Sequence, residues 1–154
     1  MRLKRVRRFG AAGAVVAAAT TALVVSVPST ASAASDWKCF GTAVKRCATV
    51  WWDEVADTYQ ARAKITDVAG GRDYEVKVTN VKLLRTDESE WVTVRTKADT
   101  DGWHATEDSA NTSTVDPCAY PRQSYTVEAT FSWRDGNSGE DIWRPNHSWG
   151  SLCA

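Results

Sequence analysis

Residues 124–134 alternate strictly between apolar and polar side chains, and this pattern limits the possible folds more than any other part of the chain. The odd positions are apolar, namely Tyr125, Val127, Ala129, Phe131 and Trp133, and the even positions are polar. Side chains on a β-strand point alternately to opposite faces, whereas a helix would distribute both sets around its circumference. The segment is therefore predicted to be a long strand whose apolar face needs a second layer to cover it.

Short segments of strand-like composition follow one another through the rest of the chain, and no segment shows a helical period. Besides 124–134, strands are predicted at residues 47–52, 58–68, 72–84, 90–97, 112–115 and 142–144. Within 72–84 the apolar phase shifts between Val78 and Val81, which predicts a β-bulge at Thr79 and Asn80. About seven strands predict an all-β fold, an antiparallel β-sandwich of immunoglobulin-like or fibronectin-like outline, with a small closed barrel as the alternative.

The first 33 residues have the organisation of a secretory signal peptide. Five basic residues precede an uncharged run from 11 to 27, and Ala31, Ser32 and Ala33 form a small-residue cleavage site. A retained membrane anchor is the alternative, because the run is nearly long enough to span a bilayer. Cleavage after Ala33 leaves residues 34–154 as one secreted domain. The Ala-rich, Arg-heavy leader resembles those of high-GC Gram-positive bacteria.

Charge restricts the partners of the secreted part. Residues 34–154 carry 14 basic and 19 acidic side chains, a formal charge of −5. A mildly acidic surface argues against nucleic acid, and against a membrane once the leader is removed. The expected partner is therefore an extracellular glycan or protein.

The four cysteines, Cys39, Cys47, Cys118 and Cys153, all follow the leader. An even number of cysteines in a secreted chain indicates disulfides. Three pairings are possible, and we favour Cys39–Cys47 and Cys118–Cys153, which close the two ends of the domain. A metal site built from the thiols is the alternative, but no closely spaced pair of the zinc type is present.

Eight tryptophans are a heavy load for a chain of this size. A tryptophan side chain buries ~150–250 Å², so most of them are expected in the core. The candidates for the surface are Trp91, Trp103, Trp143 and Trp149, and exposed rings of this kind stack on sugars. The alternative is that these rings cover strand edges and cap the core.

A group of carboxylates in 98–111 suggests a calcium site. Asp99 and Asp101 stand at alternate positions before Gly102, and Glu107 and Asp108 could supply further oxygens. The complete EF-hand pattern is missing, and Asp-Gly is also a common turn dipeptide. Apart from this calcium ion, no cofactor is expected.

No catalytic residues are predicted, because no nucleophile motif such as Gly-X-Ser-X-Gly occurs. The favoured hypothesis is a small secreted, non-enzymatic protein that binds a polysaccharide or cell-wall surface through exposed tryptophans. One alternative is a protein-interaction module, an inhibitor or adhesion unit, that uses the 98–111 loop. The other is a hydrolase that uses His104 and nearby carboxylates.

Overall fold

The computed structural model describes residues 36–68 and 74–150. The predicted signal peptide lies outside these residues. Among the residues that it describes, none belongs to a helix with the length and apolar content needed to cross a bilayer.

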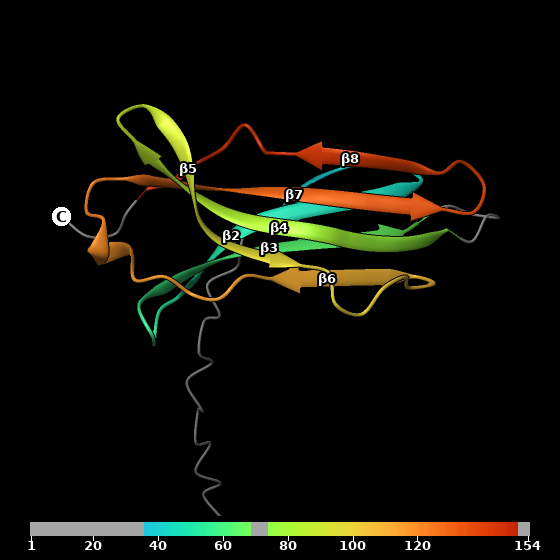
Figure 1. Ribbon diagram of the computed structural model, residues 1–154, viewed down its shortest axis with the longest axis horizontal. Coiled ribbons are helices and arrows are strands. Elements are labelled where there is room, and N and C mark those ends of the chain that lie inside the picture. The colour runs from blue at the N-terminus through green and yellow to red at the C-terminus, as the bar shows by residue number, and fades with distance from the viewer. Residues whose placement is uncertain (1–35, 69–73, 151–154) are drawn as a thin grey trace, which may run out of the picture. The chain divides into compact units, whose positions relative to one another are not determined.

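The described chain is all-β, with two antiparallel sheets in a sandwich-like arrangement (Figure 1). The strands are β1 (Lys38–Phe40), β2 (Val44–Asp53), β3 (Thr58–Asp67), β4 (Glu75–Asp87), β5 (Glu90–Ala98), β6 (Glu107–Asn111), β7 (Ser124–Arg134), β8 (Gly139–Trp143) and β9 (Trp149–Gly150). Sheet A has the order β1-β2-β3-β6. Sheet B has the order β5-β4-β7-β8, and β9 also pairs with β7. In Figure 1, β4 and β7 run in front of β2 and β3.

The alternating segment is confirmed as a strand, since β7 covers all of 124–134. Tyr125, Val127, Ala129 and Phe131 are fully buried and join the residues of β2, β3 and β4 in one core cluster. The same pattern of burial on alternate residues is found along β3 and the first half of β4. The apolar faces of the two sheets therefore cover each other, as the sequence requires.

The predicted β-bulge is confirmed at its predicted place. The pairing of β4 with β7 changes register between Val78 and Asn80, so that Thr79 is the extra residue. A second irregularity lies between Leu83 and Leu84, where β4 pairs with β5. The first bulge keeps Val76 and Val78 on the same buried face as Val81.

The prediction for 98–115 is wrong in its details. The segment expected to be a loop contains β6 at Glu107–Asn111, and the expected strand at 112–115 makes only an isolated bridge, between Val115 and Tyr59. The sequence of β6 has no apolar face, because its inward positions are Asp108 and Ala110. The loop between β5 and β6 is therefore limited to residues 99–106.

One predicted disulfide is confirmed. Cys39 of β1 lies directly opposite Cys47 of β2 in the sheet register, and the two sulfur atoms are bonded. The other predicted pairing involves Cys153, which lies outside the described residues, so that pairing stays a prediction.

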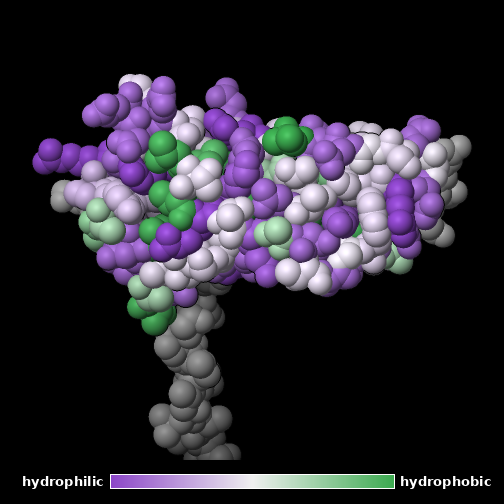
Figure 2. Space-filling view, in the orientation of Figure 1, coloured by the Kyte–Doolittle hydropathy of each residue, from purple (hydrophilic) through white to green (hydrophobic). Residues whose placement is uncertain are grey.

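The surface in the view of Figure 2 is mostly hydrophilic, with only small apolar patches. The large apolar side chains that are exposed come from four separate segments: Val55, Val68, Tyr120 and Ile142. All eight tryptophans are partly buried. A functional surface must therefore be sought in local pockets and clusters of side chains.

Candidate functional site

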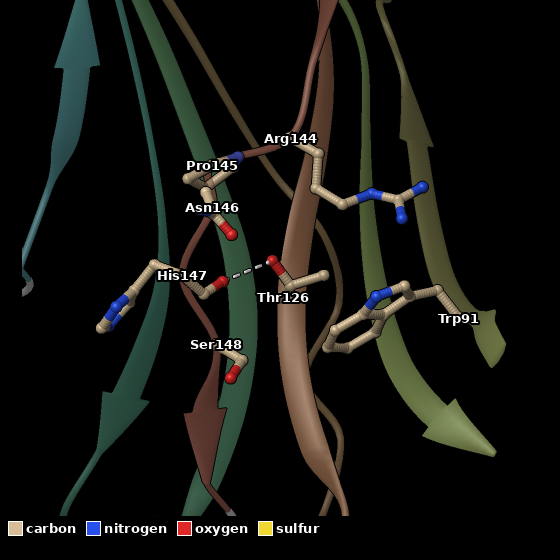
Figure 3. Close-up of a pocket in the computed structure, with 7 residues that line it drawn as sticks. All are labelled: Trp91, Thr126, Arg144, Pro145, Asn146, His147 and Ser148. Atoms are coloured by element: carbon tan, nitrogen blue, oxygen red, sulfur yellow. Dashed lines mark hydrogen bonds between the residues drawn. The ribbon is translucent and has the colours of Figure 1, made fainter. Parts of the chain in front are cut away.

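A pocket of about 520 Å³ opens on sheet B, on the side away from the core. We name it the Trp91 pocket, and its lining is Trp91, Thr126, Arg144, Pro145, Asn146, His147 and Ser148 (Figure 3). Most of these residues belong to the connection between β8 and β9.

The wall formed by residues 144–148 results from an interruption in the edge strand of sheet B. β8 pairs with Ala129–Trp133 of β7 and β9 pairs with Ser124 and Tyr125, so the intervening connection leaves the ladder beside the middle of β7. Pro145 has no amide to donate to a ladder, which favours a departure at this place. The hydroxyl of Thr126 donates a 3.0 Å hydrogen bond to the carbonyl of His147 and holds the connection against β7 (Figure 3).

The opposite wall is Trp91, which lies on β5 across from Thr86 of β4. Leu84 and Thr126 also face each other in the register of β4 and β7, so their side chains share one face of the sheet. Leu84 is only 3% exposed although it lies outside the core cluster. In Figure 3 the indole of Trp91 reaches toward Thr126, and Arg144 extends beside it. Trp91 and Thr126, which line the pocket, therefore lie on the same outer face of sheet B as Leu84.

An ion-pair network fixes the polar rim of the pocket. Glu128 accepts hydrogen bonds from Lys82 at 2.8 Å and from Arg144 at 2.7 Å. These hydrogen bonds, first that of Lys82 and then that of Arg144, lower the pKa of Glu128 against the opposing effect of burial. Arg144 is thus paired with Glu128, and in Figure 3 its side chain extends on the side of Trp91.

The structure separates the four predicted surface tryptophans. Only Trp91 lines the pocket. Trp103 lies between two cations, with Arg134 4.5 Å and Lys77 5.6 Å from its ring centroid. Trp143 packs on Phe40 with 4.5 Å between ring centroids, and Trp149 meets His147 edge-on at the same distance. Both of these last two tryptophans also pack against the core.

The four carboxylates predicted to hold calcium are divided in the same way. Asp99 pairs with Lys77 at 2.9 Å and accepts hydrogen bonds from the backbone amides of Asp101 and Gly102. These contacts, chiefly that with Lys77, hold the pKa of Asp99 far below its usual range. Glu107 pairs with Lys64 at 3.3 Å. Asp101 and Asp108 do converge, but on His104 rather than on the other two carboxylates.

We name Asp101, His104 and Asp108 the His–Asp cluster. His104 Nε2 lies 3.5 Å from Asp101 Oδ2 and 3.7 Å from Asp108 Oδ1. The Asp108 side chain is only 4% exposed, whereas that of Asp101 is 62% exposed. The three residues come from the loop and from the second residue of β6, a segment without periodicity in its sequence, so no sequence pattern indicated that they meet.

Comparison with known proteins finds no family model and no curated sequence that matches this chain. The function must therefore be argued from the geometry of the pocket and the cluster.

Proposed function

We propose that this chain is a secreted, non-enzymatic binding module whose Trp91 pocket holds a sugar unit of an extracellular polysaccharide. The observation that carries the proposal is that one indole ring, a paired arginine, an amide and a hydroxyl line a single pocket. The apolar face of a pyranose packs on an aromatic ring, while its hydroxyls need donors and acceptors at the ring edge. Trp91 supplies the first contact, and Arg144, Asn146 and Ser148 supply the second.

The size of the pocket supports a small organic ligand. Its volume of about 520 Å³ falls within the ~300–1,000 Å³ that is usual for ligand pockets. An open pocket of this kind suits one or two units of a longer chain.

The pairing of Arg144 bears on the charge of the ligand. Arg144 and Lys82 both pair with the carboxylate of Glu128. Because Arg144 is already paired, a phosphate or sulfate group would have to compete with Glu128 for it. Sugar hydroxyls can add to the pair without breaking it.

Secretion, and an origin in a high-GC Gram-positive bacterium, remain part of the proposal. They depend on the composition of the leader, and the Cys39–Cys47 bridge supports an oxidising compartment. The immunoglobulin-like or fibronectin-like outline is supported by the chain path, which crosses between the sheets from β3 to β4, from β5 to β6 and from β6 to β7.

The test is retention of the purified protein on insoluble glycans such as cellulose, chitin, xylan and peptidoglycan. We expect the wild-type protein to be retained on one of them and Trp91→Ala to lose most of that retention. Trp51→Ala is the matched control, because Trp51 stacks against Arg62 at 4.0 Å on sheet A, outside the pocket. Failure of every glycan to retain the wild-type protein, or equal retention of the two variants, would contradict the proposal.

The protein-interaction alternative is narrowed to residues 99–106, because Glu107–Asn111 forms β6. The hydrolase alternative would use His104 with Asp101 and Asp108. For that cluster the geometry supports a different role, argued next.

A further inference from the structure

We propose that the His–Asp cluster of Asp101, His104 and Asp108 binds a divalent cation of the zinc type. This inference does not depend on the proposed glycan site, which lies on other residues. It differs from the calcium site predicted at Asp99, Asp101, Glu107 and Asp108, with which it shares two residues.

The spacing of the three side chains fits a tetrahedral ion. A tetrahedral zinc ion with bonds of about 2.0–2.1 Å places neighbouring ligand atoms about 3.3 Å apart. His104 Nε2 lies 3.5 Å from the nearer oxygen of Asp101 and 3.7 Å from that of Asp108. All three ligand atoms lie within 4.8 Å of one another. Small side-chain movements are enough to place an ion between them.

The imidazole provides the observation that distinguishes this cluster from an ordinary group of carboxylates. The His104 side chain is 35% exposed, but its Nε2 atom is inaccessible to solvent and makes no hydrogen bond, although it lies near two carboxylates. A buried polar atom without a partner is unfavourable, so its presence needs an explanation. Coordination of an ion by this nitrogen gives one, since zinc takes imidazole nitrogen together with carboxylate oxygen.

Two of the three ligands are already held in place by the backbone of β4. His104 exchanges two backbone hydrogen bonds with Val76, at 2.8 and 3.0 Å. Asp108 accepts the amide of Val78 with Oδ2 at 2.6 Å, which leaves Oδ1 on the side of His104. Such fixed hydrogen bonds to a ligand orient it toward the metal and reduce the ordering that binding requires.

Space for a fourth ligand is present beside the two carboxylates. A cavity of about 200 Å³ is lined by residues that include Asp101, Asp108 and Asn111 but not His104. A site with three protein ligands keeps one position for water or another molecule, as open zinc sites do.

Calcium fits the cluster less well. Calcium requires six to eight oxygen ligands and does not favour imidazole. The other two predicted ligands are engaged elsewhere, Asp99 with Lys77 and Glu107 with Lys64. A protonated His104 paired with both carboxylates is the metal-free alternative, and the experiment must distinguish it from coordination.

The experiment uses chelator-treated full-length protein at pH 7.5, titrated separately with Zn²⁺ and Ca²⁺. We expect calorimetry to give one Zn²⁺ per chain, thermal melting to rise by several degrees and EDTA to reverse the rise. Co²⁺ should give the intense visible absorption of a tetrahedral site. Ca²⁺ should change neither measurement.

The variants assign the site to these residues. Asp101→Asn changes an exposed side chain and should keep the fold, yet it should weaken Zn²⁺ binding at least tenfold. His104→Gln should abolish the Co²⁺ spectrum. Glu107→Gln, on the same strand as Asp108, is the matched control and should bind as the wild-type protein does. The proposal is overturned if Zn²⁺ does not bind stoichiometrically, if Asp101→Asn and Glu107→Gln bind it equally, or if only Ca²⁺ stabilises the protein.

Discussion

The carboxylate of Asp108 on β6 accepts a 2.6 Å hydrogen bond from the backbone amide of Val78 on β4. Asp108 belongs to sheet A and Val78 to sheet B, so one buried side chain joins the two sheets. Next to this contact the edge of β4 is paired with the loop, through Val76 with His104 and Thr79 with Asp99. The carboxylate thus takes the place of a backbone partner at the bulge.

Replacement of Asp108 by Ala should therefore destabilise the fold. The Val78 amide would lose a charged acceptor in a buried position, which costs ~2–3 kcal/mol. Urea denaturation should show a lower midpoint with an unchanged slope. Glu107→Ala, which removes the half-exposed partner of Lys64, should cost less than about 0.5 kcal/mol. Equal losses in the two variants would contradict a structural role for Asp108.

Substitution at Gly139 should also be costly, for a steric reason. A Cβ at this position would stand 2.3 Å from Cζ2 of Trp133, which is packed against the core. Gly139→Ala should therefore displace the indole and cost ~1–3 kcal/mol. Gly150→Ala is the control, because a Cβ there meets nothing within 4 Å. Thermal melting distinguishes the two variants. A melting temperature of Gly139→Ala equal to that of the wild-type protein would show that the Trp133 indole can move aside at no cost.

The ion-pair network at the pocket predicts a pH-dependent stability. Because the folded state lowers the pKa of Glu128, its carboxylate stabilises the fold fully at pH values above its unfolded pKa of about 4.3. That contribution is lost as the pH falls through the lower, folded pKa. Glu128→Gln should thus melt below the wild-type protein at pH 7, and the difference should narrow toward pH 3. A constant difference across this range would contradict the assignment.

Thr126 should link the stability of the β8–β9 connection to ligand binding. Thr126→Val keeps the shape of the side chain but removes the hydroxyl that donates to His147, at a cost of ~1 kcal/mol. Because residues 144–148 form one wall of the Trp91 pocket, retention on the glycan that binds the wild-type protein should fall as well. Thr130→Val, on the same strand and face, should leave retention unchanged. Unchanged retention in Thr126→Val would mean that the wall does not depend on this contact.

The strands with a clear apolar face could be predicted from the sequence, and the others could not. β3 and β7 were placed within one residue of their observed ends because their apolar residues alternate. β6 was missed because one of its inward positions is an aspartate, whose burial depends on the amide of Val78. That amide can donate to a side chain because the pairing of β4 with β5 ends at Asn80, which is a tertiary relationship.

The candidate site was predicted only in part for a similar reason. The ring of Trp91 was identified from composition, but its neighbours could not be, because they reach it through the pairing of β8 and β9 with β7. Asp101 and Asp108 were identified as ligand candidates, while His104 was assigned to a different hypothesis. Sequence spacing does not show that a loop follows the edge of β4 and turns its imidazole toward β6.

The bridge between Cys39 and Cys47 has a consequence for how molecules of this protein behave toward one another. β1 is only three residues long, and it covers part of the outer edge of β2. Such a short strand makes few hydrogen bonds to β2. The disulfide therefore keeps β1 attached to β2 even when those hydrogen bonds break. Cleaving that link would uncover amides and carbonyls along β2 that a second molecule could pair with. We therefore expect the disulfide to limit self-association, and light scattering should detect larger particles in the Cys39→Ala, Cys47→Ala double variant than in the wild-type protein.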